Sequence, residues 1–244
     1  MDSIASFDLA LFILATFAAS LVAGLAGFAF GLVAAAVWLH ILPAAQTTAL
    51  IVGFGLVVQG YAVWKLRRAI KASRLVPFIL GGAVGVPLGV EALQWMSPDA
   101  MRAAVGVVLI AYSIYALTRP TLPNVSAGGR TADGGIGLLS GILGGATGLA
   151  GILAVVWCGL RGWPKDEQRA VFQPVGVAIF AMTAIWLGGS GTADRDTGFL
   201  FLAGLPAVLA GSWVGLKLYG RLDQATFAKV VLVLLLISGV FLIV

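Results

Sequence analysis

Residues 134–160 read GGIGLLSGILGGATGLAGILAVVWCGL and contain no Asp, Glu, Lys or Arg. A helix that crosses a membrane needs about 20 mostly apolar residues, so this run is longer than one ordinary span. Glycine clusters interrupt it, and Gly141, Gly144 and Gly148 form a GxxGxxxG pattern. Residues 9–42 form a second charge-free run that is longer still. Both segments therefore predict something other than a single straight helix.

The composition of the whole chain is typical of a protein surrounded by lipid. Of its 244 residues, 60% are hydrophobic and 10% are charged, and the mean hydropathy is +1.05. A soluble domain carries about 25% charged residues. We therefore predict an all-α integral membrane protein. Six further stretches are long and apolar enough to span a bilayer: roughly 45–64, 75–95, 99–118, 170–189, 197–217 and 224–243.

A pattern shared by the two long runs predicts an internal repeat. Gly24, Gly27 and Gly31 form the same GxxGxxxG pattern, 117 positions before the second copy. A proline follows each run, and Pro43 and Pro164 are 121 positions apart, which we interpret as a four-residue insertion in the second copy near residues 161–163.

Further along the chain, Gly85 and Gly89 match Gly211 and Gly215 at a spacing of 126. Spacings that drift in one direction are typical of a diverged duplication. The predicted division is an N-terminal transmembrane repeat (1–118), an inter-repeat loop (119–133) and a C-terminal transmembrane repeat (134–244).

Basic residues predict how residues 134–160 lie, because Lys and Arg accumulate on the cytoplasmic side of a membrane. If this run crosses once, the fifteen basic residues divide eight against seven; if it enters and returns, they divide thirteen against two. We therefore predict two half-length helices that meet at a glycine tip. The repeat predicts a matching hairpin in residues 9–42. One hairpin plus three full spans per half would make the halves inverted repeats, as in many secondary transporters.

The predicted tips suit an anion. Backbone amides at a helix N-terminus carry partial positive charge, and glycine lets a ligand approach them closely. The alternative is that these glycines only permit close helix packing. The predicted substrate-binding residues are Gly27, Phe30, Gly31, Gly144, Thr147, Gly148, Gln173 and Gln59.

Few other polar side chains lie at membrane depth. Gln59 and Gln173 can bind a substrate oxygen or form a hydrogen bond between helices. His40 and Glu91 are candidates for proton coupling, although each also fits a structural position near the membrane interface.

The sequence lacks the residues that several classes of function require. The chain has no GxxxxGK[ST] phosphate loop, no His/Cys metal spacing and no nucleophile–His–acid set, so we expect neither an enzyme nor a metal or cofactor. We interpret the basic residues as topology signals rather than as a nucleic-acid surface. Expected partners are the lipid bilayer, a small anion and a second copy of the chain, since the row Gly81, Gly85 and Gly89 suits dimerisation or internal packing.

The glycine hairpin, apolar run, proline and polar turn, present once per half, resemble the TauE/SafE sulfite exporter family. The loop Trp64-Lys-Leu-Arg-Arg68, followed by Pro77 and a glycine row, is also similar. The resemblance covers nearly the whole chain. It implies a multi-pass permease of the bacterial inner membrane for sulfite, organosulfonates or related small anions. The alternative hypothesis is a membrane scaffold or assembly subunit that transports nothing.

Overall fold

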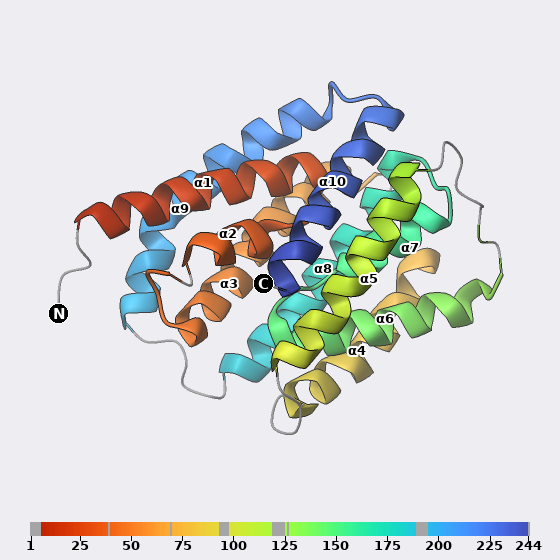
Figure 1. Cartoon of the computed structure of the whole chain (residues 1–244), viewed down its shortest axis with the longest axis horizontal. Helices are drawn as coiled ribbons and strands as arrows, with labels where there is room; N and C mark the ends of the chain where they lie inside the picture. Colours follow the sequence, from red (N-terminus) through yellow and green to blue (C-terminus); the bar gives the residue numbers. More distant parts are fainter. Residues whose placement is uncertain are drawn as a thin grey trace.

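The computed structural model describes residues 6–38, 40–68, 70–92, 98–118, 125, 127–188 and 195–243 (Figure 1). In these ranges the chain is helical and contains no strand. The helices are α1 (Ser6–Ala26), α2 (Phe30–Trp38), α3 (Ala44–Leu66), α4 (Ala72–Ala92), α5 (Pro98–Thr118), α6 (Gly129–Thr147), α7 (Ile152–Leu160), α8 (Lys165–Gly188), α9 (Arg195–Tyr219) and α10 (Gln224–Ile243).

The helices confirm the prediction of an all-α membrane protein. Within the described residues, α1, α3, α4, α8 and α9 each contain a stretch long and apolar enough to cross a bilayer. Large apolar side chains face outward along them, with Leu80 64% exposed and Leu202 67% exposed. Such surface suits contact with lipid rather than with water.

Both charge-free runs are broken where the sequence predicts a tip, but their arms are unequal. The first breaks between α1 and α2, and the second between α6 and α7. Helices α2 and α7 have nine residues each, whereas α1 has 21 and α6 has 19. The prediction of paired half-length helices is therefore wrong for the first arm of each hairpin. Helix α6 also begins at Gly129, so the last residues of the predicted loop 119–133 are helical; residues 119–124 lie outside the described part.

Helices α4 and α6 pack with their backbones almost in contact. A Cβ atom placed on Gly85 would lie 2.1 Å from the carbonyl oxygen of Leu138, and one on Gly89 would lie 2.1 Å from that of Ile142. Small residues at a helix interface allow this approach in membranes, where close packing replaces the hydrophobic effect between helices. The glycine row thus serves internal packing, which was one of its two predicted uses.

Helices α1 and α9, which also come from different halves, form a matching contact and lie side by side in Figure 1. A Cβ atom on Gly211 would lie 2.5 Å from the carbonyl oxygen of Phe17, and one on Gly215 would lie 2.2 Å from that of Leu21. In each half, the first arm of the hairpin therefore packs on the third long helix of the other half.

These contacts correct the register of the predicted repeat. Gly27 and Gly148, which are 121 positions apart, both end the first arm of a hairpin with a positive φ. Gly24 and Gly145, also 121 apart, both pack on the glycine helix of the opposite half. The match at 117 positions is therefore wrong, and no insertion is needed before Pro164.

A reciprocal crossing of α3 and α8 follows the same register. A Cβ atom on Gly55 would lie 2.7 Å from Cε2 of Phe180, and one on Gly176 would lie 2.1 Å from Oε1 of Gln59. Gly55 corresponds to Gly176, and Gln59 corresponds to Phe180, again at 121 positions. Each helix thus inserts one large side chain against a glycine of the other.

The inverted relation of the two halves stays a prediction, as does the division into two repeats. Figure 1 agrees with the inversion, because α5 and α10 lie side by side and run in opposite directions.

Both ends of the second hairpin lie on one side of the molecule. Arg161, just after α7, forms an ion pair of 3.1 Å with Asp133 of α6 and donates a hydrogen bond to the carbonyl oxygen of Gly129. This contact supports the prediction that the run enters and returns.

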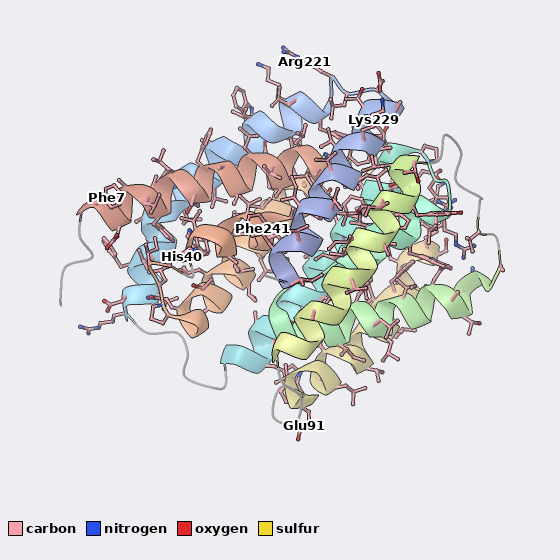
Figure 2. All side chains as sticks on the ribbon, in the orientation of Figure 1. Phe7, His40, Glu91, Arg221, Lys229 and Phe241 are labelled. Carbon is pink, nitrogen blue, oxygen red and sulfur yellow. The ribbon has the colours of Figure 1, made fainter. Side chains whose placement is uncertain are left out.

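Other basic segments gather at this end. Lys71 and Arg74 pair with Glu167 at the start of α8, and Lys165 donates to the carbonyl oxygen of Leu222. Figure 2 shows Arg221 and Lys229 near the connection between α9 and α10. These contacts therefore bring the starts of α4 and α8 together with the α9–α10 connection, and their cytoplasmic location stays a prediction.

The close contact of α4 and α6 predicts that Gly85→Ala lowers stability. The added methyl group must displace backbone, which typically costs about 1–3 kcal/mol. We expect a lower melting temperature in detergent. Gly60→Ala is the matched control, because a Cβ atom at this helical glycine meets nothing within 4 Å. A Gly85→Ala protein as stable as the Gly60→Ala protein would contradict this packing.

Candidate functional site

The first tip consists of Gly27, Phe28 and Ala29, between α1 and α2. Gly27 has a φ of 88° and Ala29 has a φ of 71°. The left-handed region is open to glycine but costs other residues roughly 1–2 kcal/mol. Ala29 is therefore strained, and it caps α2 by accepting a hydrogen bond from the Val33 amide. The break thus rests on backbone geometry rather than on a proline.

Helix α8 packs directly on this tip. A Cβ atom on Gly27 would lie 2.7 Å from Cε2 of Phe172 and 3.0 Å from Nε of Arg169. The Gln173 amide nitrogen Nε2 donates a hydrogen bond of 3.4 Å to the carbonyl oxygen of Gly27. One face of α8 therefore holds the tip in place.

The second tip lies between α6 and α7. Gly148 ends α6 with a φ of 70°, and its amide donates to the carbonyl oxygen of Gly144. Gly151 precedes α7 with a φ of 88°. A Cβ atom on Gly151 would lie 3.6 Å from the carbonyl oxygen of Phe172 and 3.9 Å from Cα of Gly176. This tip therefore rests on the same turn of α8 as the first.

The start of α2 lies close to the second tip. A Cβ atom on Gly31, the second residue of α2, would lie 3.7 Å from Cδ2 of Leu149 in the second tip. Two helix N-termini, those of α2 and α7, thus begin in one region. The first amides of a helix have no partner within it and carry partial positive charge.

The surroundings of the tips are mainly apolar. Phe28 packs edge-on against Phe172 at a centroid distance of 6.5 Å. Gln173 is fully buried, and its Oε1 atom has no hydrogen-bond partner. A buried polar atom without a partner is costly, which marks Gln173 as a residue kept for more than packing.

From the sequence alone, Arg169 is only one of the basic residues that predict the topology. Its side chain is 0% exposed, one turn before Gln173 on α8. Nη1 donates to the carbonyl oxygen of Leu25 and Nη2 donates to that of Gly24, at 3.2 and 2.8 Å. Its guanidinium also lies 4.0 Å from the ring centroid of Tyr219. The only sequence signal is a basic residue inside a helix, four positions from a predicted ligand.

The structure places one of the predicted site residues in the core and two others beside the second tip. Phe30 points into an aromatic cluster with Trp38 and Phe54, so its ring fills the core rather than the tip. Gly144 lies one turn before the break, and a Cβ atom on it would lie 2.4 Å from Cγ2 of Ile179 and 3.4 Å from Cα of Ala150 in the second tip. Gln59 lies at the α3–α8 crossing against Gly176, which neighbours Gly151 of the same tip. Residue 147 ends α6, and its side chain lies outside the described part. Of the predicted residues, Gly27, Gly31, Gly148 and Gln173 come together, and their binding role stays a prediction.

His40 and Glu91 are both exposed and lie outside the two tips. Figure 2 shows Glu91 at the lower edge of the fold and His40 in its left part. Their predicted role in proton coupling is not tested by this placement, which fits the structural alternative.

The described residues contain no group of three or more His, Cys, Asp or Glu side chains that could hold a metal ion. The groups that the tips do offer are amides, one guanidinium and one glutamine. Such a set can bind and release an anion by hydrogen bonding.

The fold and the tips define a class: a multi-pass helical transporter with two discontinuous helices that meet inside it. A family model described as sulfite exporter TauE/SafE matches residues 12–242. The chain belongs to this family, which is a family of membrane transporters. No curated protein and no solved structure showed significant similarity to the chain.

The first tip predicts a large effect of Gly27→Ala. The substitution combines a left-handed φ with overlap against Phe172 and Arg169, so we expect a lower melting temperature and loss of transport. Ala29→Gly is the control within the same tip, because it removes strain and should leave both properties close to wild type. Full activity of Gly27→Ala would contradict the described tip.

Proposed function

We propose that this protein is a secondary transporter that moves small anions such as sulfite or organosulfonates across the bacterial inner membrane. Family membership supports a sulfite-exporter type of transport. The chain has no phosphate loop, so an ion gradient or a partner would supply the energy.

The observation that carries the proposal is the meeting of the two broken hairpins on one turn of α8, around the buried Gln173. Helix breaks at membrane depth are tolerated where they line a binding site, because lipid cannot satisfy the freed backbone groups. In transporters with repeated halves, substrate binds between such discontinuous helices. The positive ends of α2 and α7 suit a negative substrate.

The proposed mechanism is alternating access. The two tips and helices α2, α3, α7 and α8 would form the centre, while the paired helices α1–α9 and α4–α6 would move as rigid bodies around it. Their glycine contacts keep each pair tightly packed. The basic end would face the cytoplasm, in agreement with the positive-inside rule.

Flux of anions tests the proposal. Purified protein in proteoliposomes should release or take up sulfite faster than protein-free liposomes, as measured by stopped-flow detection. Flux equal to that of empty liposomes for sulfite and for several sulfonates, from a monodisperse protein, would favour the non-transporting scaffold.

Cysteine labelling tests the orientation. The natural Cys158 is buried, so the wild-type protein provides an unreactive background. In intact cells, a membrane-impermeant maleimide should label Glu91→Cys but reach Lys71→Cys only after permeabilisation, because these positions lie at opposite ends of α4. The reverse labelling pattern would overturn the proposed topology.

A further inference from the structure

Arg169 is a buried cation that takes part in none of the ion pairs formed by the described residues. Asp166 interacts with it electrostatically, and Tyr219 contacts both side chains. Burial of a charge is costly, and this carboxylate and the two carbonyl oxygens at the end of α1 offset part of that cost. A membrane protein that retains such a charge has a functional candidate at that position.

The Nε atom of Arg169 faces the first tip. It is buried and has no hydrogen-bond partner, and it lies 3.0 Å from a Cβ position on Gly27. An Nε–H group that donates to an anionic oxygen forms a charge-assisted hydrogen bond, which is stronger than a neutral one. One strong donor at the tip is therefore free for a ligand.

Gln173 adds a hydrogen-bond acceptor beside the Arg169 donor. Residues four apart lie on one face of a helix, so Arg169 and Gln173 approach the same tip. The carbonyl oxygen of Gly27 can only accept a hydrogen bond, which fixes the Gln173 amide with Nε2 toward it. Oε1 is then left as a buried acceptor without a partner. This atom repels a bare anionic oxygen but accepts from an O–H or N–H group.

A cavity that is open to the surface and includes two lysines borders Tyr219. It has a volume of about 290 Å³ and is lined by Tyr61, Lys65, Leu66, Trp213, Leu216, Lys217 and Tyr219. The ring of Tyr219 forms part of its wall and also lies against the Arg169 guanidinium. Lys65 and Lys217, which are both exposed, would attract an anion to this cavity.

We infer that Arg169 and Gln173 form a subsite for a monoanionic oxyanion that carries its own hydrogen-bond donor, reached from the Lys65–Lys217 cavity past Tyr219. This inference rests on the proposed function. Hydrogen sulfite fits the chemistry, with one charged oxygen for Arg169 and one proton for Gln173. Sulfate lacks the donor in the same pH range, and methanesulfonate is a monoanion without a donor.

Binding to the wild-type protein tests the subsite without any variant. Affinities for sulfite, sulfate and methanesulfonate are measured by isothermal titration calorimetry across the pH range in which sulfite takes up its proton. Affinity for sulfite should follow the fraction of hydrogen sulfite, and the two other anions should bind at least about tenfold more weakly. Equal affinity for sulfite and sulfate at every pH would overturn the inference.

Variants separate the two side chains. Arg169→Gln should weaken hydrogen sulfite binding by roughly 10-fold to 100-fold, the range expected for a hydrogen bond to a charged group. Arg169→Lys keeps the charge and should bind more tightly than Arg169→Gln. Gln173→Leu should remove the preference for hydrogen sulfite over methanesulfonate. Arg221→Gln, which removes an exposed charge from the same end, is the matched control and should bind as wild type.

Other groups near the subsite could contribute to a pH dependence. Tyr219 from α9 faces Arg169, and its hydroxyl donates to Asp166 of α8; Lys65 and Lys217 line the cavity. Tyr219→Phe should keep the pH profile, whereas a profile that moves with Tyr219→Phe would overturn the inference. Wild-type protein that neither binds nor transports any anion would refute the proposed function itself. Transport with anion selectivity unchanged in Arg169→Gln and Gln173→Leu would refute this inference alone.

Discussion

A helix that stops inside a bilayer leaves backbone groups that lipid cannot bind, and this cost governs the whole arrangement. At the first tip, side chains of α8 form hydrogen bonds with these backbone groups. Arg169 binds the last carbonyl groups of α1, and Gln173 binds the carbonyl group of Gly27. At the second tip, Gly148 turns back on α6 and binds the carbonyl group of Gly144. The breaks therefore depend on α8 lying between them, and α8 in turn is held by α3.

The glycine interfaces make this position possible. Helices α1 and α6 approach α9 and α4 so closely that side chains are excluded from the contact. Two tight helix pairs thus enclose the centre, and the first arms of both hairpins belong to them. Rigid pairs around a centre held by few polar contacts suit a protein that must change its conformation, because tightly packed pairs move as units while the central contacts exchange.

The sequence predicts most of the helices and the existence of both breaks. Residues 224–243 were expected as one span and form α10 with those bounds. The breaks followed from charge-free runs that were too long and from the distribution of basic residues. The register of the repeat did not follow, because glycine serves both close packing and helix ends. Gly144 and Gly148 fit one motif, yet only Gly148 has the positive φ that ends α6. The sequence does not predict the burial of Arg169, because that burial depends on α1 and α9, which are far away in the sequence.

The two halves have diverged at the positions that matter most. Residues 48 and 52 of α3 correspond to Arg169 and Gln173 of α8 in the register of 121, and they are threonine and valine. Only one of the two tips therefore has a buried guanidinium and amide beside it. In the predicted inverted arrangement, two identical halves would give outward and inward conformations of equal energy. Substitutions confined to one copy would remove that equality, so we expect the transporter to favour one conformation and to differ between its two faces.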